Sequence, residues 1–277
     1  MAATVSPVSP DVGVEVAGLT GPRLVDPAVA AECQALLEKH GVVIYREVHV
    51  EDADLVAFSR MLGTVVVAPM GGMDGLPEVS KITLDPAESV LAAYRRGTFF
   101  WHLDGANDEL PQKATLLTAR QVSDEGGDTE FANTYAAYDA LPADEKEQFA
   151  RLRVVHSFAA SQALAEPDAS PKTRASWERV PAREHPLVWT RRSGRRSLLV
   201  GATASHVVGW PEEDSRALLD RLLAWSTQPR FVLRHHWRPG DLVIWDNTGM
   251  LHRAIPYTAT SHRLMHRTTL RGEEVVA

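Results

Sequence analysis

Short apolar runs separated by turn residues constrain the fold of this chain more than any other feature of its sequence. Turns such as Gly126-Gly127-Asp128, Ser193-Gly194 and Pro239-Gly240 lie between many of these runs. Many short strands divided by such turns are typical of a β-sandwich or barrel. The runs expected to form strands are 42–45, 114–119, 153–157, 187–190, 197–201, 231–236, 241–245 and 263–270.

A few amphipathic helices accompany the strands. Asp26-Pro27 is a typical helix start, and apolar residues then recur on one helical face until His40-Gly41. The other expected helices are 55–62, 134–141, 143–152 and 211–225. The sequence therefore predicts a mainly β protein with flanking α-helices.

Length and composition indicate one globular domain. The chain has 277 residues, of which 44% are hydrophobic and 23% are charged. Residues 1–13 are rich in Ser, Pro and Val and are expected to form a loose lead-in to a single domain at 14–277. The stretch 163–181 holds three prolines without periodicity, which predicts a mobile lid or a disordered insert.

Charge and cysteine content exclude several classes of protein. The formal net charge is −7, and the densest basic stretch, 191–196, is expected to be a hairpin tip, so nucleic acid is not an expected partner. A single cysteine, Cys33, excludes an internal disulfide. The chain shows no secretory signal and no apolar run of 18 residues. We therefore expect a cytoplasmic protein without a membrane partner.

Two histidines and an aspartate form the first chemical motif. His102 and Asp104 are two residues apart, so on an extended segment both side chains point the same way. This pair alone is also compatible with a hydrogen-bonded loop. His252 follows the strand-like run 241–245, and two histidines with one carboxylate are the usual ligands of non-haem Fe(II) oxygenases. Zinc can use the same ligands.

Two arginines form the second motif. Arg263 and Arg267 share a face with Met265 if 263–270 is a strand. Buried together, two guanidinium groups need anionic partners, and arginine binds carboxylates with two hydrogen bonds. The alternative is that both arginines point into solvent.

Together these motifs resemble the taurine dioxygenase/2,4-D dioxygenase family of Fe(II)/2-oxoglutarate oxygenases. The resemblance runs from about residue 13 to 272 and rests on 101–104, 126–132, 136–138, 240–247, His252, Arg263 and Arg267. It implies a double-stranded β-helix (jelly-roll) core, a homo-oligomer (dimer or tetramer), and Fe(II), 2-oxoglutarate and O2 as cofactors. It also implies residue roles: His102, Asp104 and His252 as catalytic iron ligands, Thr129 and Arg263 for 2-oxoglutarate, and Arg267 for an acidic substrate.

The sequence departs from the taurine branch of this family where the substrate would bind. The stretch 68–75 contains no His or Tyr, and Thr98 stands where the taurine enzyme has Asn. Thr98, Met70 and Met73 become candidate contacts to a bulkier substrate, although core packing explains the methionines equally well.

We therefore predict a dioxygenase that hydroxylates a small, lipophilic carboxylate, with C–O cleavage as a further outcome and with succinate and CO2 as co-products. The alternatives are an oxygenase of the same class acting on a sulfonate or sulfate ester, a non-catalytic acid-binding β-barrel module, and a zinc hydrolase.

Overall fold

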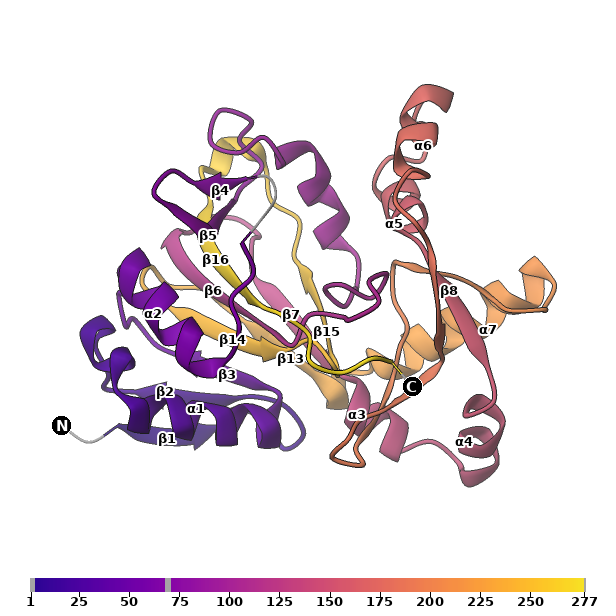
Figure 1. Ribbon diagram of the computed structural model, residues 1–277, viewed down its shortest axis with the longest axis horizontal. Helices are drawn as coiled ribbons and strands as arrows, with labels where there is room; N and C mark the ends of the chain where they lie inside the picture. The colour runs from indigo at the N-terminus through magenta and orange to yellow at the C-terminus, as the bar shows by residue number, and fades with distance from the viewer. Residues whose placement is uncertain (1–2, 68–70, 277) are drawn as a thin grey trace.

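The structure is a computed structural model and describes residues 3–67 and 71–276. Across these ranges the largest sheet has the strand order β1-β2-β3-β14-β6-β16-β5-β4, antiparallel except between β2 and β3 (Figure 1). Its strands are β1 Thr4–Pro7, β2 Val14–Ala17, β3 Val42–Tyr45, β4 Gly72–Met73, β5 Leu76–Ile82, β6 Ala114–Gln121, β14 Leu242–Asp246 and β16 Leu264–Leu270.

A smaller sheet faces this large one. It has the order β13-β7-β15, from β7 Thr129–Asn133, β13 Val232–His235 and β15 Met250–Ala254. Apolar side chains from both sheets form one buried cluster, in which Phe131 and Leu233 of the small sheet meet Val243 and Met265 of the large one. The two facing sheets make up the jelly-roll core that was expected.

Alternation along β14 shows how the large sheet serves two cores. Leu242 and Ile244 belong to the cluster beneath the helices, whereas Val243 and Trp245 belong to the cluster between the sheets. The helices on the outer face are α1 Pro27–His40 and α2 Asp52–Leu62. The Asp26 carboxylate accepts a hydrogen bond from the Ala28 amide at the start of α1, as its sequence predicts.

The chain between β7 and β13 lies on the right of Figure 1, and its apolar cluster around Trp189 also includes Ala132 of β7 and Leu251 of β15. Its strands are β8 Arg153–His156, β9 Arg183–Pro186, β10 Val188–Thr190, β11 Arg196–Leu198 and β12 Ala204–Val207. Its helices are α3 Thr134–Asp139, α4 Ala143–Phe149, α5 Phe158–Ala165, α6 Pro171–Trp177 and α7 Glu212–Ser226. Short 3-10 helices are η1 Gly21–Val25, η2 Ala92–Phe99, η3 Pro229–Phe231 and η4 Ala259–Ser261.

Two sequence expectations differ from the structure. Residues 4–7, expected to be part of a loose lead-in, form β1, which pairs with β2 along the edge of the large sheet. All four residues are exposed, so the strand forms through backbone pairing. Its sequence has no apolar pattern that would predict a strand. The stretch 163–181 contains the end of α5 and all of α6, which the Ser170 hydroxyl caps, so about half of it is helical. Its role as a lid stays a prediction.

Within the described residues, no helix is long and apolar enough to cross a membrane.

Candidate active site

The structure brings His102, Asp104 and His252 together at one end of the space between the two sheets. His102 makes an isolated β-bridge with His252 of β15, through backbone hydrogen bonds of 3.0 and 2.9 Å. Asp104 carboxylate oxygens lie 3.8 Å from Nε2 of His102 and 3.7 Å from Nε2 of His252. One potential ligand atom from each residue lies within 4.8 Å of the others. These separations allow the three atoms to hold one metal ion.

Secondary hydrogen bonds orient each of these side chains. The Nδ1 atoms of His102 and His252 lie 2.8 and 3.4 Å from the backbone oxygens of Phe100 and Met250, which leaves both Nε2 atoms facing the carboxylate. Such outer partners fix the ring tautomer of metal-binding histidines.

A hydroxyl and an amide hold the carboxylate in turn. Thr115 Oγ1 donates to Asp104 at 2.9 Å and accepts from the Asn247 side-chain amide at 2.9 Å. The two residues come from β6 and from the turn after β14, so the large sheet itself positions the Asp104 carboxylate.

The electrostatics of the three residues suit a cation. Burial lowers the pKa of His252 to about 3, with a further contribution from His102, so this imidazole is neutral and free to coordinate. Burial alone would raise the pKa of Asp104, but the charges of Arg267 and the histidines outweigh it and hold that pKa well below its usual range. A neutral imidazole and an ionised carboxylate are the forms that bind a divalent metal. The residues present therefore fit Fe(II).

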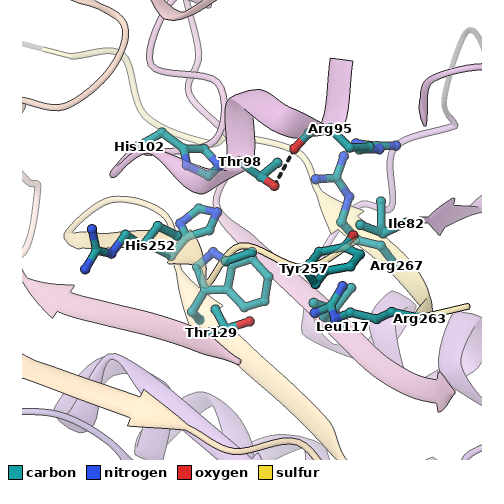
Figure 2. Close-up of a pocket in the computed structure, with 13 residues that line it drawn as sticks. Ile82, Arg95, Thr98, His102, Leu117, Thr129, His252, Tyr257, Arg263 and Arg267 are labelled. Carbon is teal, nitrogen blue, oxygen red and sulfur yellow. Dashed lines mark hydrogen bonds between the residues drawn. The ribbon is translucent and has the colours of Figure 1, made fainter. Parts of the chain in front are cut away.

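A cavity extends from these residues between the sheets (Figure 2). Arginines stand at its other end, opposite the histidines, and apolar side chains form much of its wall. The lining residues are Ile82, Arg95, Thr98, His102, Leu117, Thr129, Trp245, His252, Arg253, Ala254, Tyr257, Arg263 and Arg267.

Arg263 is held firmly by the protein. Its side chain is buried, its Nε donates to the Gly127 backbone oxygen at 3.1 Å, and its guanidinium lies 4.8 Å from the centre of the Tyr257 ring. Burial lowers its pKa. Thr129 of β7 lines the same cavity, and its hydroxyl accepts a hydrogen bond from the Trp237 indole at 3.0 Å. Arg263 and Thr129 can together face a carboxylate.

Arg267 lies closer to the metal ligands. One of its terminal nitrogens is 3.5 Å from an Asp104 oxygen, and its Nε is buried without a partner among the described residues. The next side chain along β16 towards the N-terminus, His266, points to the opposite face and contacts Asp52 of α2 at 2.8 Å. The expected alternation thus directs Arg267, with Met265, to the space between the sheets.

Sequence reasoning missed several residues of this cavity, among them Arg95 and Tyr257. Arg95 belongs to η2, seven positions before His102 in the sequence, and its neighbour Arg96 is exposed. Nothing in the run Tyr94-Arg95-Arg96-Gly97 distinguishes the arginine that turns inward from the one that faces solvent.

The three candidate substrate contacts have different places. Thr98 lines the cavity, and its hydroxyl donates to the Arg95 backbone oxygen at 2.6 Å. Met73 lies in β4 beside a separate depression, which Lys81 and Glu88 also line, so the structure does not bring it to the cavity. Met70 falls outside the described residues.

Comparison with known proteins identifies the family of this chain. Residues 4–269 match the model of the family described as "Taurine catabolism dioxygenase TauD, TfdA family", and the chain belongs to it. The α-ketoglutarate-dependent 2,4-dichlorophenoxyacetate dioxygenase of Cupriavidus pinatubonensis (strain JMP 134) is 34% identical and aligns over 88% of this chain and 89% of its own. The α-ketoglutarate-dependent sulfate ester dioxygenase of Pseudomonas putida is 32% identical, over 97% and 89%.

Solved structures agree. A taurine dioxygenase from Burkholderia xenovorans is 31% identical with a TM-score of 0.79, covering 99% of this chain and 90% of its own. The structure described as AAD-2 in complex with Mn(II) and N-oxalylglycine is 27% identical with a TM-score of 0.82, covering all of both chains. The protein is an Fe(II)- and 2-oxoglutarate-dependent dioxygenase with a jelly-roll fold, and it uses O2.

Proposed function

We propose that this enzyme oxidises a C–H bond of a small, lipophilic carboxylate, with succinate and CO2 as co-products. The observation that carries the proposal is Arg267, which lies in the cavity beside the metal ligands with guanidinium donors left over. A carboxylate bound there would place its neighbouring carbons next to the metal, because the same guanidinium reaches to within 3.5 Å of Asp104.

The residues of the chain divide the work. His102, Asp104 and His252 would hold Fe(II), and Arg263 with Thr129 would hold the distal carboxylate of 2-oxoglutarate. When bound, iron with 2-oxoglutarate and O2 supplies the oxidant for the C–H bond. The protein contributes orientation of the two acids and a binding space screened from water.

The apolar wall suits a hydrocarbon or aromatic substrate body. Ile82, Leu117 and Trp245 line the cavity between its two charged ends. Burying an apolar group against such side chains favours binding and displaces water. Relatives carry names that refer to phenoxy acids, which combine an aromatic body with a carboxylate.

Hydroxylation is the expected primary outcome. If the oxidised carbon bears an ether or ester oxygen, the product is a hemiacetal or its equivalent, which breaks apart with cleavage of the C–O bond. The second candidate is a sulfonate or sulfate ester as substrate, because one relative is named a sulfate ester dioxygenase. Oligomeric state, as a dimer or tetramer, stays a prediction.

Substrate-stimulated formation of succinate tests the proposal. The protein would be loaded with Fe(II) and incubated with 2-oxoglutarate, ascorbate and a panel of phenoxy and alkyl carboxylates, sulfonates and sulfate esters. We expect succinate and an oxidised product in equal amounts for at least one acid. No stimulation by any acid, with iron content verified, would reject the proposal and favour a role in acid binding without turnover.

A further inference from the structure

Arg95 gives the substrate end of the cavity a second guanidinium beside that of Arg267. η2 packs against β15 and carries Arg95 into the cavity, where both arginines reach toward the end opposite the histidines (Figure 2). The two groups are close enough for the charge of Arg267 to add to burial in lowering the pKa of Arg95, to about 10. At neutral pH the Arg95 guanidinium remains positively charged.

Neither guanidinium is fully satisfied by the protein. The Nε atoms of Arg95 and Arg267 are buried and have no hydrogen-bond partner within the described residues. Asp104 is the carboxylate whose charge acts on both arginines, and it also faces the metal site. Two like charges with open donors in a partly buried cavity favour an anion that can accept from both.

The other charged side chains near the cavity have partners of opposite charge. Arg253 pairs with Glu130 at 2.7 Å, and Asp128 behind Arg263 pairs with Arg234 at 2.8 Å. Asp108 is exposed, lies outside the cavity lining and has the charge of Arg183 opposite it. These residues leave the charge of the cavity to three arginines and Asp104.

The remaining charge exceeds what a monoanionic substrate can neutralise. Arg95, Arg263 and Arg267 against Asp104 leave two positive charges, and Fe(II) cancels the two negative charges of 2-oxoglutarate. A substrate with one negative charge would leave one positive charge in the cavity. A substrate with two negative charges would leave no net charge in the cavity. If Arg95 were absent, a substrate with one negative charge would be sufficient to neutralise the cavity.

We infer that the primary substrate of this enzyme carries two negative charges at one end, which Arg95 and Arg267 bind together. This inference rests on the proposed function and specifies its substrate class. A phosphate or phosphonate group and a pair of carboxylates share this chemistry. Arg95 is then the residue that sets the preference for a dianion over a monoanion.

Matched substrate pairs test the inference at pH 7.5. Hexyl phosphate and hexyl sulfate have the same shape but differ by about one charge, and hexylmalonate and octanoate provide the corresponding carboxylate pair. We expect kcat/KM, from succinate and product formation, to favour the dianion of at least one pair by about tenfold. The pair that shows the preference identifies the head group.

Two variants assign that preference to Arg95. Arg95→Met should lower kcat/KM for the preferred dianion by about tenfold and leave its monoanionic partner within about threefold. Arg96→Met is the matched control, because it removes an exposed arginine from the same helix and should change neither value. Calorimetric binding of each pair to protein loaded with Mn(II) and N-oxalylglycine gives the same comparison without turnover.

The outcomes separate this inference from the proposed function. Equal or better use of the monoanions by the wild-type enzyme would overturn the inference while the proposed function stands. Preferential binding of a dianion without oxidation of any compound would support the inference and count against the proposed function. A preference that survives Arg95→Met would remove the role assigned to Arg95.

Discussion

At the metal end of the cavity each ligand side chain has a secondary contact to the protein, whereas at the arginine end buried donors are left without one. His102 Nδ1 lies 2.8 Å from a backbone oxygen, and Asp104 accepts from Thr115 at 2.9 Å. By contrast, the Nε atoms of Arg95 and Arg267 have no partner within the described part of the chain. The protein alone therefore orients the candidate metal ligands, whereas the arginine end keeps unpaired donors for an anionic ligand.

Within the arginine end, Arg263 and Arg267 also differ in how firmly the protein holds them. Arg263 is 3% exposed and bonded to the Gly127 backbone, while the Arg267 side chain, four residues later, is 24% exposed. A group that binds the same co-substrate in every turnover, the role proposed for Arg263, gains from a fixed geometry. A group that meets the variable part of the reaction can remain adjustable.

Among the substitutions at the metal end of the cavity, removal of the Asp104 carboxylate should have the largest effect. Asp104→Ala should abolish turnover and iron retention, because two histidines alone hold Fe(II) poorly. Iron content after desalting and succinate formation measure both losses. Asp108→Ala is the control, since that carboxylate is exposed and outside the cavity. Full activity of Asp104→Ala would contradict the proposed ligand set.

Substitution of Arg263, the buried arginine of the cavity, should weaken the binding of 2-oxoglutarate. Arg263→Leu should raise the KM for 2-oxoglutarate by about a hundredfold, since a charge-assisted, two-point contact is lost. Arg263→Lys keeps the charge and should recover part of the affinity, which separates binding from folding. If both variants bind 2-oxoglutarate like the wild type, the role proposed for Arg263 is wrong.

The equivalent change at Arg267 should affect the other ligand. Arg267→Met should lower kcat/KM for the primary substrate by about 30-fold, through loss of its anion contact. The KM for 2-oxoglutarate should stay within a few-fold of wild type. Steady-state kinetics with each ligand varied in turn make this measurement. Equal effects on both ligands would erase the distinction between the two arginines.

The Thr115 hydroxyl, which donates to Asp104, tests how much this hydrogen bond contributes to metal binding. Thr115→Val removes the bond to the carboxylate at nearly constant volume and should weaken iron binding by about tenfold. Activity at saturating iron should remain close to wild type. Competition with a chelator measures the affinity. Unchanged iron affinity would mean that packing alone orients Asp104.

The smallest expected effect concerns His156, a buried histidine that does not line the cavity. Burial, with His185, lowers the pKa of His156 to about 3 from 6.5. The unfolded chain therefore binds a proton that the folded state resists, and the free energy of unfolding falls as the pH drops from 6.5 toward 3. His156→Gln should reduce this loss without changing kcat. Denaturant unfolding at pH 7 and pH 5 measures it, and an unchanged pH slope would contradict the assignment.

Local patterns in the sequence carried much of the fold. The run 42–45 and the helix from Pro27 to His40 appear at the expected residues, because alternation, caps and helical periodicity are set within a few neighbouring positions. β1 escaped prediction because its residues are exposed and only pairing with β2 forms it. Strand β7, which holds Thr129, was anticipated only as part of a turn motif.

The sequence by itself determined the kinds of groups available, two histidines, a carboxylate and two alternating arginines, because residue type and strand period are local properties. Only the tertiary structure decided that Arg95 enters the cavity while Arg96 faces solvent, and that Met73 lies elsewhere. Those outcomes depend on how η2 and β4 pack against strands distant in sequence. Local sequence does not encode the orientation that such packing gives a side chain.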